Sequence, residues 1–514
     1  MRIPLSWLRE SAQVPAGATA EDVMADLVKV GFEEEAVHRP TDALRGPVVV
    51  GQVLSLVKEP QSNGKTINWC QVRVVPEGQE QTLTGKGIDP SGVQGIVCGA
   101  HNFVEGDKVV VTLPGAVLPG DFHISARKTY GHMSAGMIAS VRELGIGEDH
   151  DGILVLSRIG LDPEIGTDAM ELLGLYDEAA EINVTPDRGY AFSIRGVARE
   201  YAHATGTVFT DPASKVSAPA SLTGGYGVKI NDDAPIYGNP GCDRFVARTV
   251  RGVDATRPTP PWMSSRLRLA GIRSISLPVD ISNYVMLELG QPLHFYDQDK
   301  LSGDIVVRRA VTGEKLTTLD GKERALDPED LLITDDSGPI GVAGVMGGAS
   351  TEVSDATSTV LIEAAHFEEV SIARSRRRHK LPSEASKRFE RGVDWQVANI
   401  AAQRAVDLLV ELAGGTADET GTDVGTAPDA VSIALPAAFA AQRIGIDFTE
   451  EQIVTSLEDL GAVVETRCWP TRSSRRLPTT PSAWRRPGLP GPPSSWPTRS
   501  ARSTATCGRR CCRA

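Results

Sequence analysis

The chain is 514 residues long, with 41% hydrophobic and 23% charged residues, which is typical of a globular protein with several domains. The formal net charge is −13, and no stretch of 18 apolar residues occurs, so we expect no transmembrane helix and no membrane partner. The N-terminus reaches Arg9 and Glu10 before an apolar run can build, which is unlike a signal peptide. Sparse cysteines without zinc spacing predict a reducing, cytoplasmic setting.

The N-terminal third divides into a helical and a β-rich part. Residues 1–38 are expected to form a helical segment, because residues 20–30 carry apolar side chains at helical spacing and Gly31 ends the run. Residues 41–152 contain about five short β-rich runs separated by turns. Such a series of short strands predicts a small β-barrel.

Mixed elements follow. Residues 153–210 are expected to be a connecting helical segment, with a helix over 192–204. Residues 211–415 form the largest predicted unit, an α+β domain. Its expected helices cover 262–270 and 394–413, and its expected strands cover 244–251, 304–309 and 359–363. A small unit over 427–466 is predicted to have a strand at 431–435 and helices at 437–444 and 449–460.

The last 48 residues differ from all of this. Residues 467–514 hold 11 Arg and no Lys, Asp or Glu, so residues 1–466 carry a net charge of −24. A basic tail on an acidic body is one pattern of an RNA-binding arm. Natural disordered arms, however, avoid the Trp and Cys that are concentrated here. We therefore favour an aberrant, disordered tail that matches the out-of-frame translation of a GC-rich message.

Motifs in the β-rich part resemble the OB-type tRNA-binding domain of several aminoacyl-tRNA synthetases. They are Cys-Gly-Ala-His-Asn at 98–102, Gly-Ala-Val-Leu-Pro-Gly at 115–120, and the serine and glycine pattern over 134–145. Such a barrel would meet RNA phosphates with cations, and the candidates are Lys58, Lys65, Arg127 and Lys128. A purely structural barrel with solvated lysines is the alternative. The loop at 59–65 keeps only the Pro and Lys of the resembled pattern.

Further motifs resemble the β subunit of bacterial phenylalanyl-tRNA synthetase. Thr-Pro-Asp-Arg at 185–188 and Gly-Val-Ala-Arg-Glu at 196–200 match segments expected to serve packing and subunit contact. The stretches 271–297, 338–367 and 373–394 resemble the family's editing domain, which removes tyrosine misattached to the phenylalanine tRNA. The resemblance thus implies a multidomain α+β protein with an OB-type barrel, a large editing domain and part of a further small domain.

The same resemblance assigns roles to six residues. Those expected to take part in editing chemistry are His294, Glu363 and Ser383, and those expected to bind the substrate are Arg273, Gly347 and Ala385. A carboxylate can accept the hydroxyl hydrogen that distinguishes tyrosine from phenylalanine, and glycine lets the backbone approach a ligand closely. The alternatives are that the histidine is structural and that the glutamate ends a strand or pairs with arginine. The basic run 374–380 is expected either to receive the tRNA 3′ end or to be a solvated surface.

The resemblance also implies partners and cofactors. These are the α subunit, in an α2β2 heterotetramer, the phenylalanine tRNA, and ATP with Mg²⁺ for the holoenzyme. The sequence contains no ATP-binding motif. This agrees with the resembled family, in which the α subunit carries amino-acid activation. The family's magnesium carboxylates would fall in the tail, which has no acidic residue, so no metal ligand is assigned. The alternatives are a free-standing tRNA-binding or editing protein, or an inactive truncated product.

Overall fold

A computed structural model describes residues 1–428 and 430–466. The chain divides into two compact units, Met1–Gly445 and a second that starts at Ile446. In the described part of the second unit lies helix α12 (Glu450–Asp459), which begins at Thr449 with a reciprocal capping box to Gln452. No helix in the described ranges is both long and apolar enough to cross a membrane. The predictions for residues 467–514 lie outside the described residues.

The N-terminal part is a small sheet covered by helices. Strands β1 (Arg2–Pro4), β12 (Ala179–Asn183) and β2 (Glu33–His38) pair antiparallel in the order β1-β12-β2. Helices α2 (Ala20–Val28) and α5 (Ile194–Thr205) pack against each other and contribute to the same core. The expectation that 1–38 and 153–210 are helical was therefore incomplete. These strands exist because segments about 140 to 180 residues apart pair, which the local pattern does not indicate.

Short helices complete this part of the chain. They are α1 (Leu5–Leu8), α3 (Pro40–Ala43), α4 (Ala169–Leu172), and the 3₁₀ helices η1 (Leu156–Ile159), η2 (Pro186–Ala191) and η3 (Pro212–Lys215). Arg188 in η2 donates to the Val30 carbonyl at 2.7 Å and stacks over Phe32. The predicted packing role of the 185–188 motif is consistent with these contacts.

The β-rich part is an antiparallel five-stranded sheet. Its strands are β3 (Val48–Pro60), β4 (Thr66–Arg73), β5 (Val93–Cys98), β6 (Lys108–Thr112) and β11 (Met137–Ile138), in the order β11-β6-β3-β4-β5. The edge strands β11 and β5 contact each other, so the sheet curls into a half-barrel. The first part of β3, residues 48–51, and most of β6 are buried on both faces, which explains their valine runs. Two ribbons flank the sheet, one formed by β7 (Val117–Leu118) and β8 (Phe122–His123), the other by β9 (Ala126–Thr129) and β10 (His132–Ala135).

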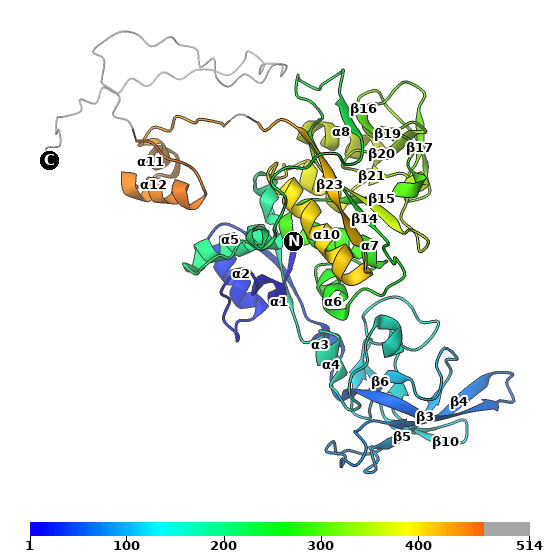
Figure 1. Ribbon diagram of the computed structural model, residues 1–514. Coiled ribbons are helices and arrows are strands. Elements are labelled where there is room, and N and C mark those ends of the chain that lie inside the picture. The colour runs from blue at the N-terminus through cyan, green and yellow to red at the C-terminus, as the bar shows by residue number, and fades with distance from the viewer. Residues whose placement is uncertain (429, 467–514) are drawn as a thin grey trace, which may run out of the picture. The chain divides into compact units, whose positions relative to one another are not determined.

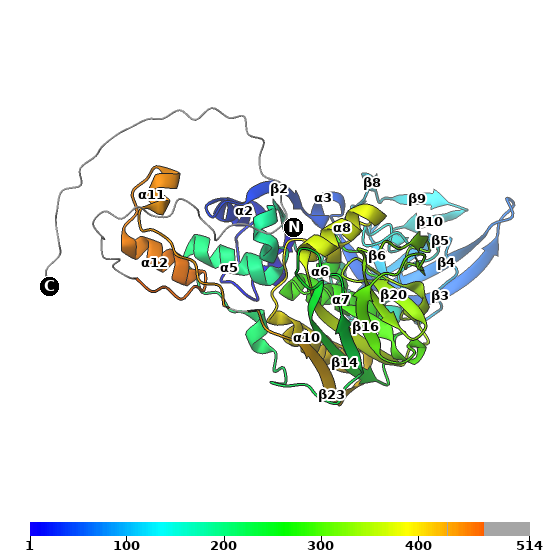
Figure 2. The same ribbon diagram turned by 90° about the horizontal axis from the view of Figure 1, so that it is seen from above.

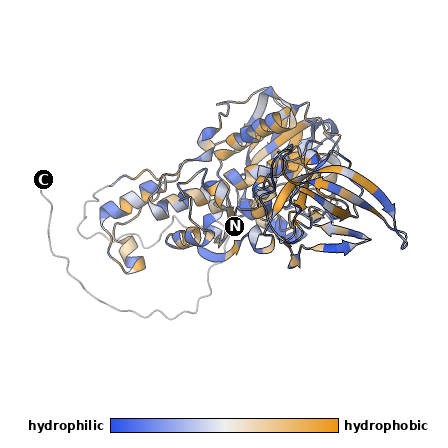
Figure 3. Cartoon of the chain, turned by 90° about the horizontal axis from the view of Figure 1, so that it is seen from below, coloured by the Kyte–Doolittle hydropathy of each residue, from blue (hydrophilic) through white to orange (hydrophobic). Residues whose placement is uncertain are grey.

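The large α+β part contains two sheets. The first has the order β15-β22-β14-β23, all antiparallel, with β14 (Cys242–Arg251), β15 (His294–Asp297), β22 (Thr359–Phe367) and β23 (Thr416–Gly425). The second has the order β13-β16-β19-β20-β21, with β13 (Val228–Asn231), β16 (Ile305–Arg309), β19 (Leu331–Asp335), β20 (Gly338–Val342) and β21 (Met346–Gly347). Across the chain, the hydrophobic colour predominates along many of the strands, whereas the helices carry both colours (Figure 3).

Strand β22 shows how the layers pack. Val360, Ile362 and Ala364 belong to the core shared with helices α7 (Leu277–Leu289) and α10 (Val397–Ala413). Leu361, Ala365 and Phe367 belong to the core shared with the second sheet. Successive strand side chains point to opposite faces, so the first sheet is the middle layer between helices and the second sheet (Figures 1 and 2). Glu363 therefore points into the space between the two sheets.

The remaining elements are short. They are α6 (Pro261–Leu269), α8 (Glu369–His379), α9 (Glu384–Phe389), α11 (Phe439–Ile444), the strand pair β17 (Lys315–Thr317) and β18 (Glu323–Ala325), and the 3₁₀ helices η4 (Gln298–Lys300) and η5 (Ala349–Thr351). The strand predicted at 431–435 is absent, because this segment has no partner strand and its Val431 is 85% exposed. An apolar run without a partner gains neither ladder hydrogen bonds nor a buried face.

Candidate functional site

The candidate site begins where β15 meets β22. His294 stands directly opposite Glu363 in the strand register, so both side chains lie on the same face of the sheet. Tyr296 follows two residues later on that face, and its ring meets the His294 ring edge-on, with centroids 4.5 Å apart. The Tyr296 hydroxyl donates a hydrogen bond to Glu363 Oε2. Two short strands thus bring an imidazole, a phenol and a carboxylate together.

Gly347 supplies the opposite wall. It lies in β21 of the second sheet, and a Cβ built on it would stand 2.4 Å from His294 Cε1 and 2.7 Å from Nε2. Real Cβ contacts are essentially never that short, so only glycine fits without displacing the imidazole. The fold therefore brings Gly347 and His294, both predicted editing residues, against each other.

Ser383 is tied to the same wall. As the N-cap of α9 it accepts from the Ser386 backbone N–H at 3.0 Å, and its Oγ donates to the Val345 carbonyl at 2.8 Å. This bond anchors the β20–β21 connection two residues before Gly347. Because the hydroxyl hydrogen is engaged, the geometry favours a positioning role over nucleophilic attack. Ala385 lies in the first turn of α9, half-buried against the core between the sheets.

Burial shifts the pKa values of the two titratable groups in opposite senses. Loss of solvation raises the pKa of Glu363 to about 7, although the Tyr296 hydrogen bond acts to lower it. Loss of solvation lowers the pKa of His294 to about 4, so the ring is neutral at pH 7. Its Nε2 is buried and has no hydrogen-bond partner among the described residues. A neutral imidazole nitrogen without a partner is available to orient a water or a ligand group.

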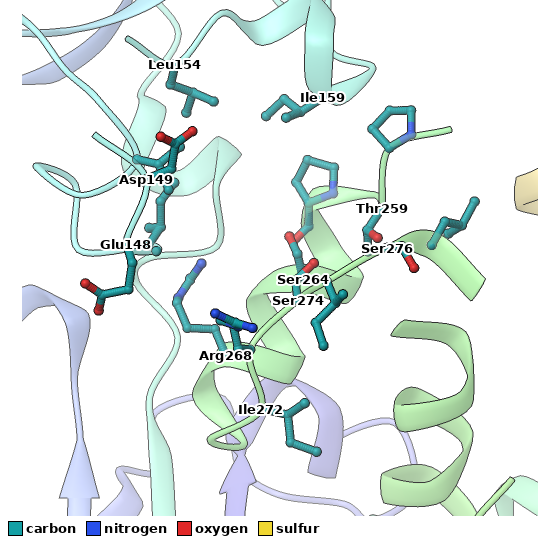
Figure 4. Close-up of a pocket in the computed structure, with 18 of the residues that line it drawn as sticks. Glu148, Asp149, Leu154, Ile159, Thr259, Ser264, Arg268, Ile272, Ser274 and Ser276 are labelled. Carbon is teal, nitrogen blue, oxygen red and sulfur yellow. The ribbon is translucent and has the colours of Figure 1, made fainter. Parts of the chain in front are cut away.

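Arg273 lies elsewhere. It is exposed on the segment before α7 and lines a pocket of about 1160 Å³. None of the other five predicted editing residues lines that pocket. Its labelled residues Glu148, Asp149 and Leu154 lie on one side, with Ser264, Ser274 and Ser276 on the other (Figure 4). The structure thus brings His294, Glu363 and Gly347 together. It links Ser383 to this wall through Val345 and leaves Arg273 in a separate pocket.

The four predicted RNA-binding cations lie on the half-barrel and its ribbon. Lys58 and Lys65 belong to the β3–β4 hairpin, and Arg127 and Lys128 belong to β9. All four are exposed, and none forms an ion pair within the described part of the chain. His132 of β10 pairs with Glu59 at 2.9 Å and stacks on Trp69, which joins ribbon and hairpin. Arg127 lies over the exposed ring of Phe122, and exposed cations and rings are the groups that a nucleic-acid backbone and its bases contact.

The basic run 374–380 is largely satisfied inside the protein. Four of its six basic side chains contact acidic side chains, and Arg377 and Lys380 make no ion pair within the described ranges. The paired members are Arg374 with Glu329, Arg376 with Glu390, and Arg378 and His379 with Asp330. Most of this run therefore stabilises α8 against its neighbours rather than presenting free charge.

Tyr296 is the member of the site that the sequence prediction omitted. The available signal was its spacing, because a residue two positions after His294 on a strand shares the same face. No group of three or more His, Cys, Asp or Glu in the described ranges is arranged to hold a metal ion. The described residues thus do not fit a magnesium site, and we derive no step through one.

The chain is similar in sequence to proteins and to a domain family that are already known. The B3/4 domain family matches residues 241–414, which contain all six predicted editing residues. The chain is 61% identical over 490 residues to the phenylalanine–tRNA ligase β subunit of Leifsonia xyli subsp. xyli, covering 94% of this chain and 56% of that protein. It is 51% identical over 482 residues to the corresponding protein of Bifidobacterium longum, covering 90% of this chain and 55% of that protein.

Among solved structures, an N-terminal fragment of the phenylalanyl-tRNA synthetase β subunit from Pyrococcus horikoshii matches 59% of this chain and 86% of its own length. The identity is 15% and the TM-score 0.27, and we draw no conclusion from so low a score. The chain spans about half the length of the curated relatives it matches. Over nearly its whole length, the chain is therefore similar in sequence to phenylalanine–tRNA ligase β subunits.

Proposed function

We propose that this chain acts as the β subunit of a phenylalanine–tRNA ligase and hydrolyses tyrosine misattached to the phenylalanine tRNA. The observation that carries the editing part is the buried carboxylate of Glu363, directly opposite His294 and covered by the second sheet. The named relatives support the role in the ligase. The single most informative test is deacylation of the two aminoacyl-tRNAs.

Selectivity in this proposal comes from Glu363. A tyrosyl group donates its phenol hydrogen to the carboxylate, whereas a phenylalanyl group leaves the acceptor unsatisfied after displacing water. An unsatisfied buried polar group costs about 1–3 kcal/mol, more if it is charged. A site that hydrogen-bonds a substrate hydroxyl rejects the analogue lacking it far better than an apolar pocket rejects an added hydroxyl.

Hydrolysis requires a positioned water. His294 is neutral at pH 7, and its pKa of about 4 makes it a poor base, so we assign it to orienting the water or the ester through Nε2. Ser383 fixes the β20–β21 wall through its bond to Val345. Gly347 lets the backbone of β21 lie directly against the imidazole, where a side chain would clash. The catalytic contribution is then chiefly placement of the reacting groups.

The rest of the proposal concerns the whole enzyme. Lys58, Lys65, Arg127 and Lys128 would contact tRNA phosphates. The α subunit would carry ATP- and Mg²⁺-dependent aminoacylation within an α2β2 heterotetramer. Arg273 and Ala385 remain proposed substrate-binding residues, Arg273 through the pocket before α7. We retain as proposals a tRNA-binding domain at 41–152, an editing domain at 211–415 and a partial domain at 427–466.

The test uses the full 514-residue chain with phenylalanine tRNA charged with tyrosine or phenylalanine. We expect faster release of tyrosine, and loss of that preference in Glu363→Ala. Equal rates for both esters, or an unchanged preference in Glu363→Ala, would refute the editing role. Co-purification with the α subunit separates the ligase role from the alternatives: a chain that edits without binding the α subunit is a free-standing editor, and one that does neither is inactive.

A further inference from the structure

Glu363 already holds a phenol belonging to the protein itself. Tyr296 is 1% exposed, and its hydroxyl donates to Glu363 Oε2. No other hydrogen bond or ion pair to this carboxylate is found among the described residues. A carboxylate has two oxygens with about four acceptor positions, so one phenol does not exhaust it. The contact therefore leaves Oε1 without a protein donor.

We propose that Tyr296 is a positioning residue that fixes the Glu363 carboxylate through Oε2 and so presents Oε1 to the phenol hydroxyl of the substrate. This inference rests on the proposed editing function and identifies the group that sets its specificity. The protein phenol and the substrate phenol then share one carboxylate. The Tyr296 ring also supports His294 edge-on, so a single side chain orients both the acceptor and the imidazole.

The residues around Glu363 explain why its carboxylate needs a hydrogen-bond donor that fixes it. Glu363 is 7% exposed, on a strand with neighbours on both sides. The titratable groups near it are His294 and Tyr296 from β15 and Cys242 from β14, and Asp335 of β19 acts on Tyr296. Within the described residues none is a cation at neutral pH, since His294 is neutral. The Tyr296 hydroxyl is then the group that favours the ionised carboxylate, while burial opposes it.

Tyr296→Phe removes this hydroxyl and keeps the ring. A hydrogen bond to a charged group is worth about 1–2 pH units in the titration of that group. We therefore expect the pH midpoint for tyrosine preference to rise by about 1–2 units in Tyr296→Phe, with about tenfold loss of preference at pH 7. The probes are tyrosine and phenylalanine linked by an amide to 3′-amino-3′-deoxyadenosine, which cannot be hydrolysed as esters.

Calorimetric binding of both probes to the full chain from pH 5.5 to 9 gives the midpoint without turnover. Tyr284→Phe is the matched control, because Tyr284 is an equally buried phenol whose hydroxyl instead bonds Arg266 at 2.9 Å. It should keep the wild-type midpoint and preference. Glu363→Gln should abolish the pH dependence near neutrality, which assigns the midpoint to that carboxyl.

A second variant guards against a folding defect. Replacing Tyr296 with 3-fluorotyrosine keeps ring and hydroxyl but strengthens the donor, so the midpoint should fall, opposite to Tyr296→Phe. Unchanged midpoints and preference in both variants would overturn the inference while leaving the editing function intact. If the wild-type chain binds both probes equally and hydrolyses neither ester selectively, the proposed function itself fails, and the role of Tyr296 with it.

Discussion

Gly347 lies against the His294 imidazole so closely that a single added methyl group would stand 2.4 Å from Cε1 and 2.7 Å from Nε2. The two residues come from different sheets, β21 and β15, and each sheet is held by its own ladder. The narrow space between them is thus set by the packing of one sheet on the other. Any side chain at position 347 must move the ring or the strand.

Gly347→Ala should therefore disable the site more than it destabilises the fold. Overpacking of this kind costs about 1–3 kcal/mol, and a small displacement of a positioned group can cost about a hundredfold in rate. We expect at least tenfold slower release of tyrosine from its tRNA, with a cooperative urea transition retained. Gly17→Ala is the control, since nothing lies within 4 Å of its Cβ position. Wild-type deacylation by Gly347→Ala would show that the imidazole position is unimportant.

Ser383→Ala tests the anchoring of the β20–β21 wall. The change removes the N-cap of α9 and the bond to the Val345 carbonyl, and caps are worth about 1 kcal/mol each. We expect a loss of about 1–2 kcal/mol in the free energy of unfolding together with slower deacylation. Ser383→Thr keeps the hydroxyl and should restore both. If Ser383→Ala loses stability but deacylates at the wild-type rate, the anchoring bond does not matter for the reaction.

The sequence predicted strands well where apolar runs are long and poorly where pairing is remote. The valine runs of β3 and β6 were expected to be strands, and they are. The strand β2 begins Glu-Glu-Glu and owes its existence to β12, about 140 residues away. The converse error is the strand predicted at 431–435, which is an apolar run that has no partner strand among the described residues. Whether such a segment forms a strand depends on a pairing partner and not on its composition alone.

The candidate site was also predictable in part: its residues could be found from motifs, but their arrangement could not. Motif resemblance supplied His294, Gly347, Glu363 and Ser383, but the register that places His294 opposite Glu363 depends on two sequence-distant strands. Tyr296 was missed because its significance depends on that register. Arg273 was expected with the others but lines another pocket; it lies on the segment before α7, and that helix follows it in the chain before β15 begins.

The free energy of unfolding should depend on pH through the titration of Glu363. Its folded pKa of about 7 lies above the ordinary value of 4.5, so between these pH values the native state holds a proton that the unfolded state has released. The stabilisation is complete below pH 4.5 and is lost as pH rises through 7, by on the order of 3 kcal/mol. Glu363→Gln should lack this decline. Urea unfolding of both proteins at pH 5, 6, 7 and 8 measures the difference.

His294 changes the pH dependence of stability in the opposite sense, so the two proteins that are compared must both contain it. Its folded pKa of about 4 lies below the ordinary 6.5, so its contribution grows as pH rises from 4 to 6.5. Because the wild type and Glu363→Gln share His294, subtraction removes this term. Parallel curves for the two proteins across pH 5–8 would mean that Glu363 titrates normally.

The cations of the half-barrel should contribute to tRNA affinity through salt-dependent binding to phosphates. Lys58, Lys65 and Lys128 are exposed and make no ion pair within the described residues, so binding RNA breaks no existing pair. Removing one lysine that binds a phosphate reduces the slope of log affinity against log salt concentration by about 1. We expect alanine at each position to weaken binding of phenylalanine tRNA and lower that slope, measured by filter binding at several salt concentrations. Lys229→Ala is the matched control, because this exposed lysine lies on β13 of the α+β part, outside the half-barrel, and pairs with Asp304 at 2.8 Å. If the slope stays at the wild-type value in all three variants, RNA binds to another surface. The control separates direct contact from long-range attraction, because loss of a positive charge through long-range attraction alone would weaken binding equally in Lys229→Ala.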